Sequence, residues 1–335
     1  MSFRLGLADG VSIVARHWTR ALQELDFEVY TVAGEGPVDH IIDGLAIDAT
    51  QPPSQAELAT VLDRADVVVV ENLCTIPLNL PASRSLGAYL RGRPAIMHHH
   101  DPPWQRNRFS HIDELPLEDP AWRHVTINDL TRRQMDDRGI QASTIYNPFE
   151  TNEPFGDRTA TRAELGVSDD TLLIAHPVRA IPRKNIPMAL RLAEELSATY
   201  WLLGQPEEGY EAQLEWLLST ASVPVIHQSG SSVPAIYAAA DGIVFPSLWE
   251  GFGNPPIEAA IHRKPVIVGD YPVARELEAL GFHWLRPNQL DEFAARIQNP
   301  DNEILDRDRA LAKRMFSIES SRDLIAKLMT EAQWL

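Results

Sequence analysis

The sequence predicts an α/β fold made of two similar domains. Short apolar runs alternate with stretches of helical period along nearly the whole chain, the pattern of parallel strands joined by crossover helices. The length of 335 residues suits two domains of about 150 residues each. Residues 148–161 are polar, contain Pro and Gly and lack an apolar period, so we interpret them as the linker between the domains.

The elements of the first half follow from apolar period. A strand over 3–8 leads into an amphipathic helix over 11–25, where Val11, Val14, Trp18 and Leu22 recur at helical spacing. The other predicted strands are 27–33, 66–70, 94–98, 124–128 and 143–146, and the other predicted helices are 55–65 and 129–138.

A second series of the same kind fills the rest of the chain. Its predicted strands are 171–175, 199–203, 224–226, 242–245 and 265–268, with a helix such as 186–196 between successive strands. The last helical stretch, 306–335, has no strand after it, so it is free to pack elsewhere.

Composition narrows the class of partner. The chain has 30 basic and 47 acidic side chains and a formal charge of -17, which disfavours nucleic acid and anionic lipid. The single Cys74 excludes an intrachain disulfide and a cysteine metal cluster. No apolar run reaches the roughly 18 to 20 residues of a membrane helix. We expect a cytoplasmic protein with no nucleic acid partner and no membrane association, and the oligomeric state stays open.

The segment 245–260, FPSLWEGFGNPPIEAA, contains more candidate ligand-binding residues than any other segment of the sequence. Gly251 and Gly253 lack side chains, so backbone amides can approach a ligand closely, and Asn254 with the following prolines starts a helix. A helix N-terminus after a glycine loop suits a diphosphate. Glu250 and Glu258 flank the loop, and each could accept hydrogen bonds from a pair of hydroxyls; alternatively, one is a solvated loop charge and the other a first-turn helix acid.

Two cations precede this block. Arg179 and Lys184 lie between a predicted strand and a helix, where a cation faces a ligand at the carboxyl end of the strand. Together they can neutralise a diphosphate without a metal. In the first half, Gly10 permits a tight turn before the first helix, and Ser12 can cap that helix. Solvated cations, and a turn without a ligand, are the alternatives.

The run from His98 to Asp101 invites a metal hypothesis. Adjacent residues of a strand point to opposite faces, so at most two of the three histidines can converge. Because no second cluster of ligands accompanies them in the sequence, we expect no metal. Histidines that only pack in the core remain an alternative.

The block 245–260 resembles the E-x7-E motif of family 4 glycosyltransferases, within the pattern PSxxEGFGxPxxEA. Residues 176–185 are similar to the GRxxxxKN stretch of that family, although Pro177 and Val178 stand where a Gly usually precedes the Arg. The resemblance extends from residue 3 to about residue 285 and implies a GT-B fold, with two Rossmann-like domains facing a central cleft. Residues 1–148 would form an acceptor domain joined by a final helix, 316–335, and residues 149–315 would bind the nucleotide sugar.

The resemblance also implies an activity: metal-independent transfer of a hexose with retention of the anomeric configuration and no cofactor. It assigns Glu258 to the ribose of the donor, Glu250 to the transferred sugar and His100, or else His99, to the donor sugar. Arg179 and Lys184 would clamp the leaving phosphate. The remaining donor contacts would come from the glycine loops, at Gly10, Gly251, Phe252, Gly253 and Asn254.

Donor and acceptor are less specified. GDP-mannose and UDP-glucose both stay open, with general resemblance favouring mannose, and the acceptor would be a soluble oligosaccharide, glycoside or small polyol. Acceptor contacts are expected from Asn72, Asp101, Trp104 and Arg106, because aromatic rings stack on sugar faces and polar groups bind hydroxyls; packing is the alternative. Two other functions remain: a nucleotide-sugar epimerase of the same fold and a non-catalytic nucleotide-sugar-binding protein. A glycogen-type phosphorylase would need a longer chain.

Overall fold

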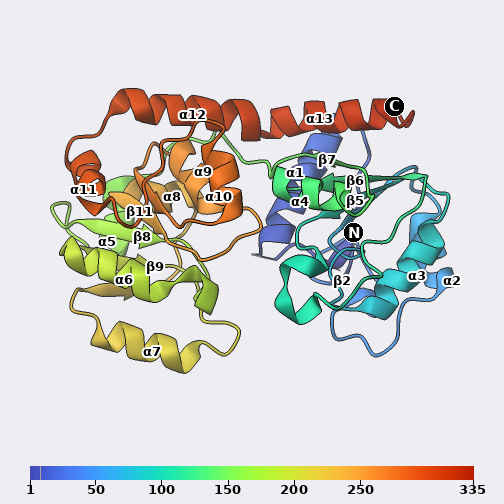
Figure 1. Ribbon diagram of the computed structural model, residues 1–335, viewed down its shortest axis with the longest axis horizontal. Coiled ribbons are helices and arrows are strands. Elements are labelled where there is room, and N and C mark those ends of the chain that lie inside the picture. The colour runs from blue at the N-terminus through green and yellow to red at the C-terminus, as the bar shows by residue number, and fades with distance from the viewer. Residues whose placement is uncertain (8) are drawn as a thin grey trace. The chain divides into compact units, whose positions relative to one another are not determined.

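The computed structural model describes residues 1–7 and 9–335 (Figure 1). The chain divides into two compact units. Unit 1 comprises Met1–Phe149 and Phe316–Leu335, and unit 2 comprises Glu150–Met315. Ala8, the last residue of the first predicted strand, lies outside the described residues.

Unit 2 is built on one parallel five-stranded sheet with the order β10-β9-β8-β11-β12. Its strands are β8 (Leu173–His176), β9 (Thr199–Leu202), β10 (Val225–His227), β11 (Gly242–Phe245) and β12 (Val266–Val268). Every residue of β8, β9 and β11 is buried, as expected of a parallel sheet whose two faces are both covered by helices. The predicted strands of this half therefore lie where their apolar runs indicated, within one or two residues.

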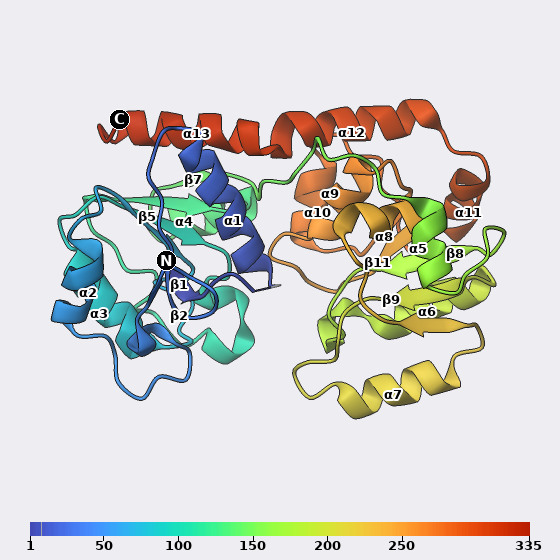
Figure 2. The same ribbon diagram turned by 180° about the vertical axis from the view of Figure 1, so that it is seen from behind.

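The helices of unit 2 cover this sheet (Figure 2). They are α5 (Arg158–Glu164), α6 (Ile186–Glu195), α7 (Glu211–Thr220), α8 (Val233–Ala239), α9 (Asn254–Ile261), α10 (Pro272–Glu278), α11 (Leu290–Gln298) and α12 (Asn302–Phe316), with the 3-10 turn η4 (Pro182–Lys184). The helix α9 packs on β11 and β12. The loop before α9 therefore starts at the carboxyl end of the sheet, where parallel strands place their ligand-binding loops.

The strands of unit 1 form two parallel sheets rather than one. The first has the order β1-β2-β3, with β1 (Ser2–Arg4), β2 (Val32–Glu35) and β3 (His40–Ile41). The second has the order β4-β5-β6-β7, with β4 (Val68–Glu71), β5 (Ala95–His99), β6 (Trp122–Thr126) and β7 (Ala142–Thr144). The predicted strands 3–8 and 27–33 are wrong in extent. The strand β1 ends at Arg4, and it pairs with Val32–Glu35, so that residues 27–31 lie outside the sheet.

Helices and short turns complete unit 1. They are α1 (Gly10–Gln23), α2 (Gln55–Leu62), α3 (Leu80–Leu90), α4 (Asp129–Asp136) and α13 (Ile318–Glu331), with the 3-10 turns η1 (Asp43–Leu45), η2 (Pro103–Gln105) and η3 (Asn107–Phe109). The sequence analysis did not assign α3, which begins at the cap Asn79 with Pro81 in its first turn.

The final helical stretch is two helices rather than one. Ser317 separates α12 from α13, and its side chain caps α13 by accepting a hydrogen bond from the Ser320 amide at 3.1 Å. The helix α13 packs along α1, where Trp18 and Leu22 share an apolar cluster with Ile325 and Met329 (Figures 1 and 2). The predicted return of the C-terminal helix to the first unit is confirmed.

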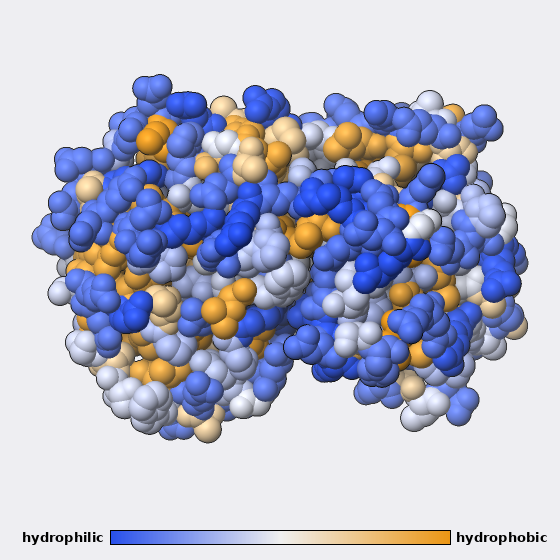
Figure 3. All heavy atoms as spheres, in the orientation of Figure 1, coloured by the Kyte–Doolittle hydropathy of each residue, from blue (hydrophilic) through white to orange (hydrophobic). Residues whose placement is uncertain are grey.

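The surface in Figure 3 is mostly hydrophilic, with small apolar patches between charged side chains. Within the described residues, none of the helices combines the length and the apolar character that crossing a bilayer requires.

Candidate functional site

The glycine loop of unit 2 connects β11 to α9. Gly253 is the N-cap residue of α9 and has a φ of +101°, a conformation that side chains disfavour. A methyl group at this position would also lie 2.4 Å from the Tyr271 hydroxyl. The glycine is therefore required locally. Since Pro255 and Pro256 have no amide hydrogen, the donors at this helix start are the loop amides up to Asn254 rather than a full first turn.

Glu250 lies just before this loop and is 5% exposed. Its Oε1 accepts a hydrogen bond from Lys184 Nζ at 2.6 Å, and its Oε2 accepts one from Arg183. Arg183 also donates to the Trp249 carbonyl at 3.0 Å. The structure therefore brings together two of the predicted residues, Lys184 and Glu250, and adds Arg183, which the sequence analysis did not assign to the site.

We call Arg183, Lys184 and Glu250 the unit 2 ion triad. Burial disfavours the charged forms of Glu250 and Lys184, whereas their opposite charges favour those forms. Burial raises the pKa of Glu250, but the Lys184 and Arg183 cations more than compensate and hold it below its usual range. Burial lowers the pKa of Lys184 to about 8, against the stabilising charge of Glu250. Two cations and one carboxylate leave one net positive charge in a largely buried site.

Two loops are bonded together to place this triad. Residues Pro182–Lys184 form a 3-10 turn after β8, and Asn185 follows in the left-handed region with a φ of 56°. The Asn185 side chain donates to the Pro246 carbonyl at 3.2 Å, and the Leu248 amide donates to the Arg183 carbonyl at 2.9 Å. Asn tolerates the left-handed region better than most residues, which explains its place in this turn.

Arg179 is positioned differently from Lys184. Its guanidinium donates to Glu207 at 2.7 Å, and its side chain is 40% exposed. Arg179 still adds to the positive field at Lys184, since it contributes to the lowering of that pKa. Val178, one of the two residues that depart from the family pattern, is buried, and its carbonyl accepts the Gly204 amide at 2.9 Å.

Glu258 lies in the second turn of α9, and among the described residues its side chain has one hydrogen-bond partner. Its Oε2 accepts a hydrogen bond from the Tyr237 hydroxyl of α8 at 2.7 Å. Burial raises the pKa of Glu258, and the Tyr237 hydrogen bond partly offsets that effect. The sequence analysis missed Tyr237, because the contact joins residues from two different helices.

The predicted glycine turn of unit 1 is a helix start. Asp9, rather than Ser12, is the N-cap of α1, and its side chain accepts the amides of Val11 and Ser12 at 3.1 Å each. The Ser12 hydroxyl donates to the same carboxylate at 2.9 Å. The predicted cap was wrong because the helix begins at Gly10, two residues before Ser12. A methyl group added at Gly10 would meet nothing within 4 Å. Packing within the described residues therefore does not demand a glycine at this position.

The three histidines at the end of β5 separate as strand geometry requires. His99 points to one side, where its Nδ1 contacts the Thr75 hydroxyl at 2.7 Å and its Nε2 contacts His124 at 2.9 Å. His98 and His100 point to the other side, and both approach Glu71. Two of the three histidines converge, as expected, and the structure adds Glu71, which the sequence analysis did not name: Glu71, His98 and His100 bring one ligand atom each within 4.8 Å of one another.

The predicted acceptor residues are held by other protein groups. Asn72 Oδ1 accepts the backbone amides of His100 and Asp101 at 3.1 Å each, so it shapes this loop. Asp101 accepts a hydrogen bond from Arg106. Trp104 donates to Gln134 at 2.8 Å, and the Arg138 guanidinium lies 4.0 Å from its ring centroid. One face of the Trp104 ring is therefore covered by a cation.

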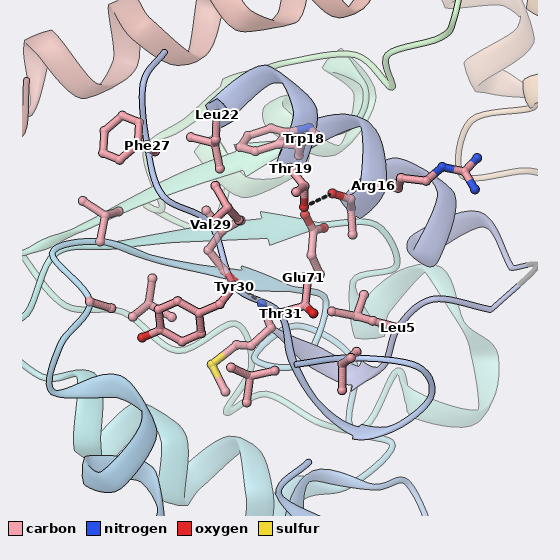
Figure 4. A pocket seen from close by; sticks show the side chains of 18 of the residues that line it. Leu5, Arg16, Trp18, Thr19, Leu22, Phe27, Val29, Tyr30, Thr31 and Glu71 are labelled. Atoms are coloured by element: carbon pink, nitrogen blue, oxygen red, sulfur yellow. Dashed lines mark hydrogen bonds between the residues drawn. The ribbon is translucent and has the colours of Figure 1, made fainter. Parts of the chain in front are cut away.

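Unit 1 also contains a pocket of about 980 Å³ (Figure 4). Its wall is formed by α1, by residues 26–32 and by β4, at the place where the predicted strand 27–33 leaves the sheet. Glu71 and Trp18 belong to this wall, whereas Gly10 and His100 do not. Within unit 1, the pocket therefore reaches the carboxylate that His100 contacts, but not His100 itself.

Comparisons with known proteins agree with this architecture. Residues 157–309 match the family described as glycosyl transferases group 1. The mannosylglucosylglycerate synthase of Thermotoga maritima is 22% identical over 419 residues, and the match covers 97% of each protein. The O-antigen chain mannosyltransferase RfbU of Salmonella typhimurium is 37% identical over 126 residues, 35% of each protein. The crystal structure of Anabaena Alr3699/HepE in complex with UDP-glucose has a TM-score of 0.70 at 18% identity and covers 98% of each chain.

These matches and the two units define the class of protein: the chain is a glycosyltransferase with the GT-B fold. The predicted fold class and the predicted resemblance to glycosyltransferases are thereby confirmed. Within that class, residues 157–309, nearly the whole of unit 2, match the model of glycosyl transferases group 1.

Proposed function

We propose that this chain is a retaining, metal-independent hexosyltransferase of the cytoplasm. It transfers mannose or glucose from GDP-mannose or UDP-glucose to a hydroxyl of a soluble carbohydrate acceptor. The observation that carries the proposal is the unit 2 ion triad, which holds Lys184 2.6 Å from Glu250 beside the glycine loop that starts α9. Two fixed cations next to backbone amides suit a diphosphate.

The roles of the unit 2 residues follow from their charges. Arg179, Arg183 and Lys184 stabilise the negative charge that grows on the leaving phosphate, the part of the reaction where preorganised cations contribute most. Glu250 accepts hydrogen bonds from the transferred sugar, and Glu258 accepts them from the ribose. The acceptor hydroxyl attacks from the face that the phosphate leaves, and a phosphate oxygen takes its proton.

Unit 1 supplies the remaining contacts in this proposal. Gly10 leaves room for the diphosphate, which is supported by the empty space that a Cβ added at this residue would meet. His100 contacts the donor sugar; His99 is less suited because both of its ring nitrogens already contact Thr75 and His124. Asp101 and Arg106 contact the acceptor, while Asn72 and Trp104 support that loop through their own hydrogen bonds.

The relatives favour mannose as the first donor sugar to test. One that matches over nearly its whole length is named a mannosylglucosylglycerate synthase, and a second is named a mannosyltransferase. We therefore propose a small glycoside of the glucosylglycerate type as the first acceptor. The acidic surface, with a formal charge of -17, favours a soluble acceptor over an anionic membrane.

The test is a transfer assay with purified protein, each of the two donors and glucosylglycerate, in the presence of a chelator. We expect release of GDP or UDP that depends on the acceptor, and NMR of the product should show the α-configuration of the donor. An inverted anomer contradicts retention, and loss of transfer with chelator contradicts metal independence. A changed donor sugar without acceptor indicates an epimerase, and tight nucleotide binding without any transfer indicates a binding protein.

A further inference from the structure

The buried carboxylate of Glu71 has no role in the function proposed above. Glu71 is the last residue of β4 and is 2% exposed. Its Oε2 lies 2.7 Å from His100 Nε2 and 2.8 Å from His98 Nδ1. We call Glu71, His98 and His100 the unit 1 triad. In Figure 4, Glu71 belongs to the wall of the unit 1 pocket.

The fold brings these residues together through strand register. Glu71 pairs with His98 where β4 and β5 run in parallel. Side chains two residues apart on a strand share a face, so His100 joins His98 on the side of Glu71. Asn72, with a φ of 60°, then binds the backbone amides of His100 and Asp101. The end of β4 therefore fixes both the backbone and the ring of His100.

The Glu71 carboxylate is itself restrained. The His98 ring packs on Trp18 of α1, with ring centroids 4.3 Å apart, and its Nδ1 approaches the same Glu71 oxygen as His100, whose ring centroid lies 4.6 Å from that of His98. Burial raises the pKa of Glu71, but the imidazoles of His98 and His100 outweigh that effect and keep it well below its usual range. Glu71 is thus an ionised carboxylate that can accept hydrogen bonds and cannot donate them.

This protonation state determines which nitrogen of His100 carries a proton. Because the carboxylate only accepts, Nε2 must be the protonated nitrogen, and in the neutral ring Nδ1 then has a free lone pair. The described residues bond the backbone amide and Nε2 of His100, and none of them bonds its Nδ1. The ring therefore presents an acceptor, which suits a hydroxyl group.

We propose that Glu71 is a positioning residue that holds His100 in the Nε2-protonated form, so that Nδ1 accepts a hydrogen bond from a hydroxyl of the donor sugar. The inference rests on the proposed function for the identity of that hydroxyl. The same three residues are also a set that transition metals bind, with two imidazoles and one carboxylate, and metal binding is the outcome that would contradict a positioning role.

The first test needs no donor. NMR of the histidine ring nitrogens, with His100 identified from the spectrum of His100→Gln, should show a proton on Nε2 and none on Nδ1. In Glu71→Leu we expect that preference to be lost. A proton on Nδ1 in the native protein would overturn the inference whatever the enzyme transfers. So would stoichiometric binding of Zn²⁺ by the native protein that disappears in Glu71→Gln.

The second test compares donors. Glu71→Leu should lower kcat/KM for the intact donor by about 10- to 100-fold, the usual effect of removing a partner that orients a site residue. For the one monodeoxy donor that lacks the bonded hydroxyl, the same substitution should have little effect, because the contact is already absent. Equal losses for the intact donor and every deoxy donor would overturn the inference.

A matched control concerns His99, which lies beside His98 on β5 and points to the other face of that strand. Thr75→Val removes the partner of His99 Nδ1, a similar buried contact, and should leave the preference among deoxy donors unchanged. Nucleotide affinity, measured with GDP and UDP alone, should stay the same in Glu71→Leu. If no donor is transferred at all, the proposed function fails together with the sugar contact, while the ring-nitrogen measurement still decides whether Glu71 sets the protonation of His100.

Discussion

Two buried carboxylates, one in each unit, are neutralised in different ways. Glu250 in unit 2 lies between Lys184 and Arg183, which carry positive charge at neutral pH. Glu71 in unit 1 lies between His98 and His100, and burial lowers the pKa of His98. The unit 2 ion triad therefore has an excess of positive charge and suits an anion, whereas the unit 1 triad has none and suits a neutral hydroxyl.

The largest effect should come from removing a cation of the unit 2 ion triad. Lys184→Ala should lower kcat by about 100- to 1,000-fold, because the charge on the leaving phosphate loses a preorganised partner. The affinity for GDP or UDP, measured by calorimetry, should change by much less. Near-normal turnover in this variant would remove Lys184 from the proposed role.

Lys264 provides the control for that experiment. It is a second lysine of unit 2 and is partly buried; burial lowers its pKa to about 8, and its Nζ donates to the Ala240 carbonyl at 2.7 Å. Lys264→Ala should therefore lower the free energy of unfolding, as loss of a partly buried hydrogen bond does, but leave kcat near the native value. Equal losses of turnover in the two variants would indicate a general effect on unit 2.

Removing the negative charge of the unit 2 ion triad, rather than one of its cations, should affect nucleotide binding and sugar transfer in opposite directions. Glu250→Gln removes the negative charge that Lys184 and Arg183 now neutralise, so both cations become available to a diphosphate. We expect GDP or UDP to bind more tightly, while kcat/KM for the donor falls by about 10- to 100-fold, since a charged hydrogen-bond acceptor for the sugar is lost. Weaker nucleotide binding would contradict this account of the charges.

The pH dependence should follow Lys184. Because burial lowers its pKa to about 8, the free enzyme loses this cation as the pH rises through that value. Above that pH, kcat/KM for the donor should fall by about tenfold per pH unit, since this parameter reports the pKa values of the free enzyme. The same fall of kcat/KM at high pH should persist in Lys264→Ala, because Lys184 is unchanged in that variant.

Burial of Lys184 also sets the sign of its effect on stability. Its pKa in the fold, about 8, lies below the ordinary lysine value of 10.5, so the unfolded chain binds more protons between these two pH values. The contribution of Lys184 to the free energy of unfolding therefore rises with pH across that window. Denaturant titrations of the native protein and Lys184→Met at several pH values would measure it.

The smallest effect concerns Gly10 in unit 1. The residue is helical and an added methyl group would meet nothing within 4 Å, so Gly10→Ala should stabilise the protein by about 0.4 to 1 kcal/mol. If the diphosphate approaches this backbone, the KM for the donor should nevertheless rise several-fold. A more stable variant with an unchanged KM would remove Gly10 from the donor site.

The sequence alone determined the βα alternation, the chain positions of the unit 2 strands and the glycine loop that starts α9. These features depend on neighbouring residues: apolar period decides burial, and glycine and proline decide local backbone conformation. For the same reason it indicated Lys184 and Glu250 as site residues, although not that they bond to each other.

Only the tertiary structure decided which groups meet. The contacts of Glu71 with His100, of Arg183 with Glu250 and of Tyr237 with Glu258 each join residues at least 20 positions apart. Strand register and helix packing bring such residues together, and no local spacing in the sequence encodes either of them. The division of unit 1 into two sheets also depends on long-range contacts. Such contacts pair β1 with Val32–Glu35 rather than with residues 27–31, and strand propensity does not report them.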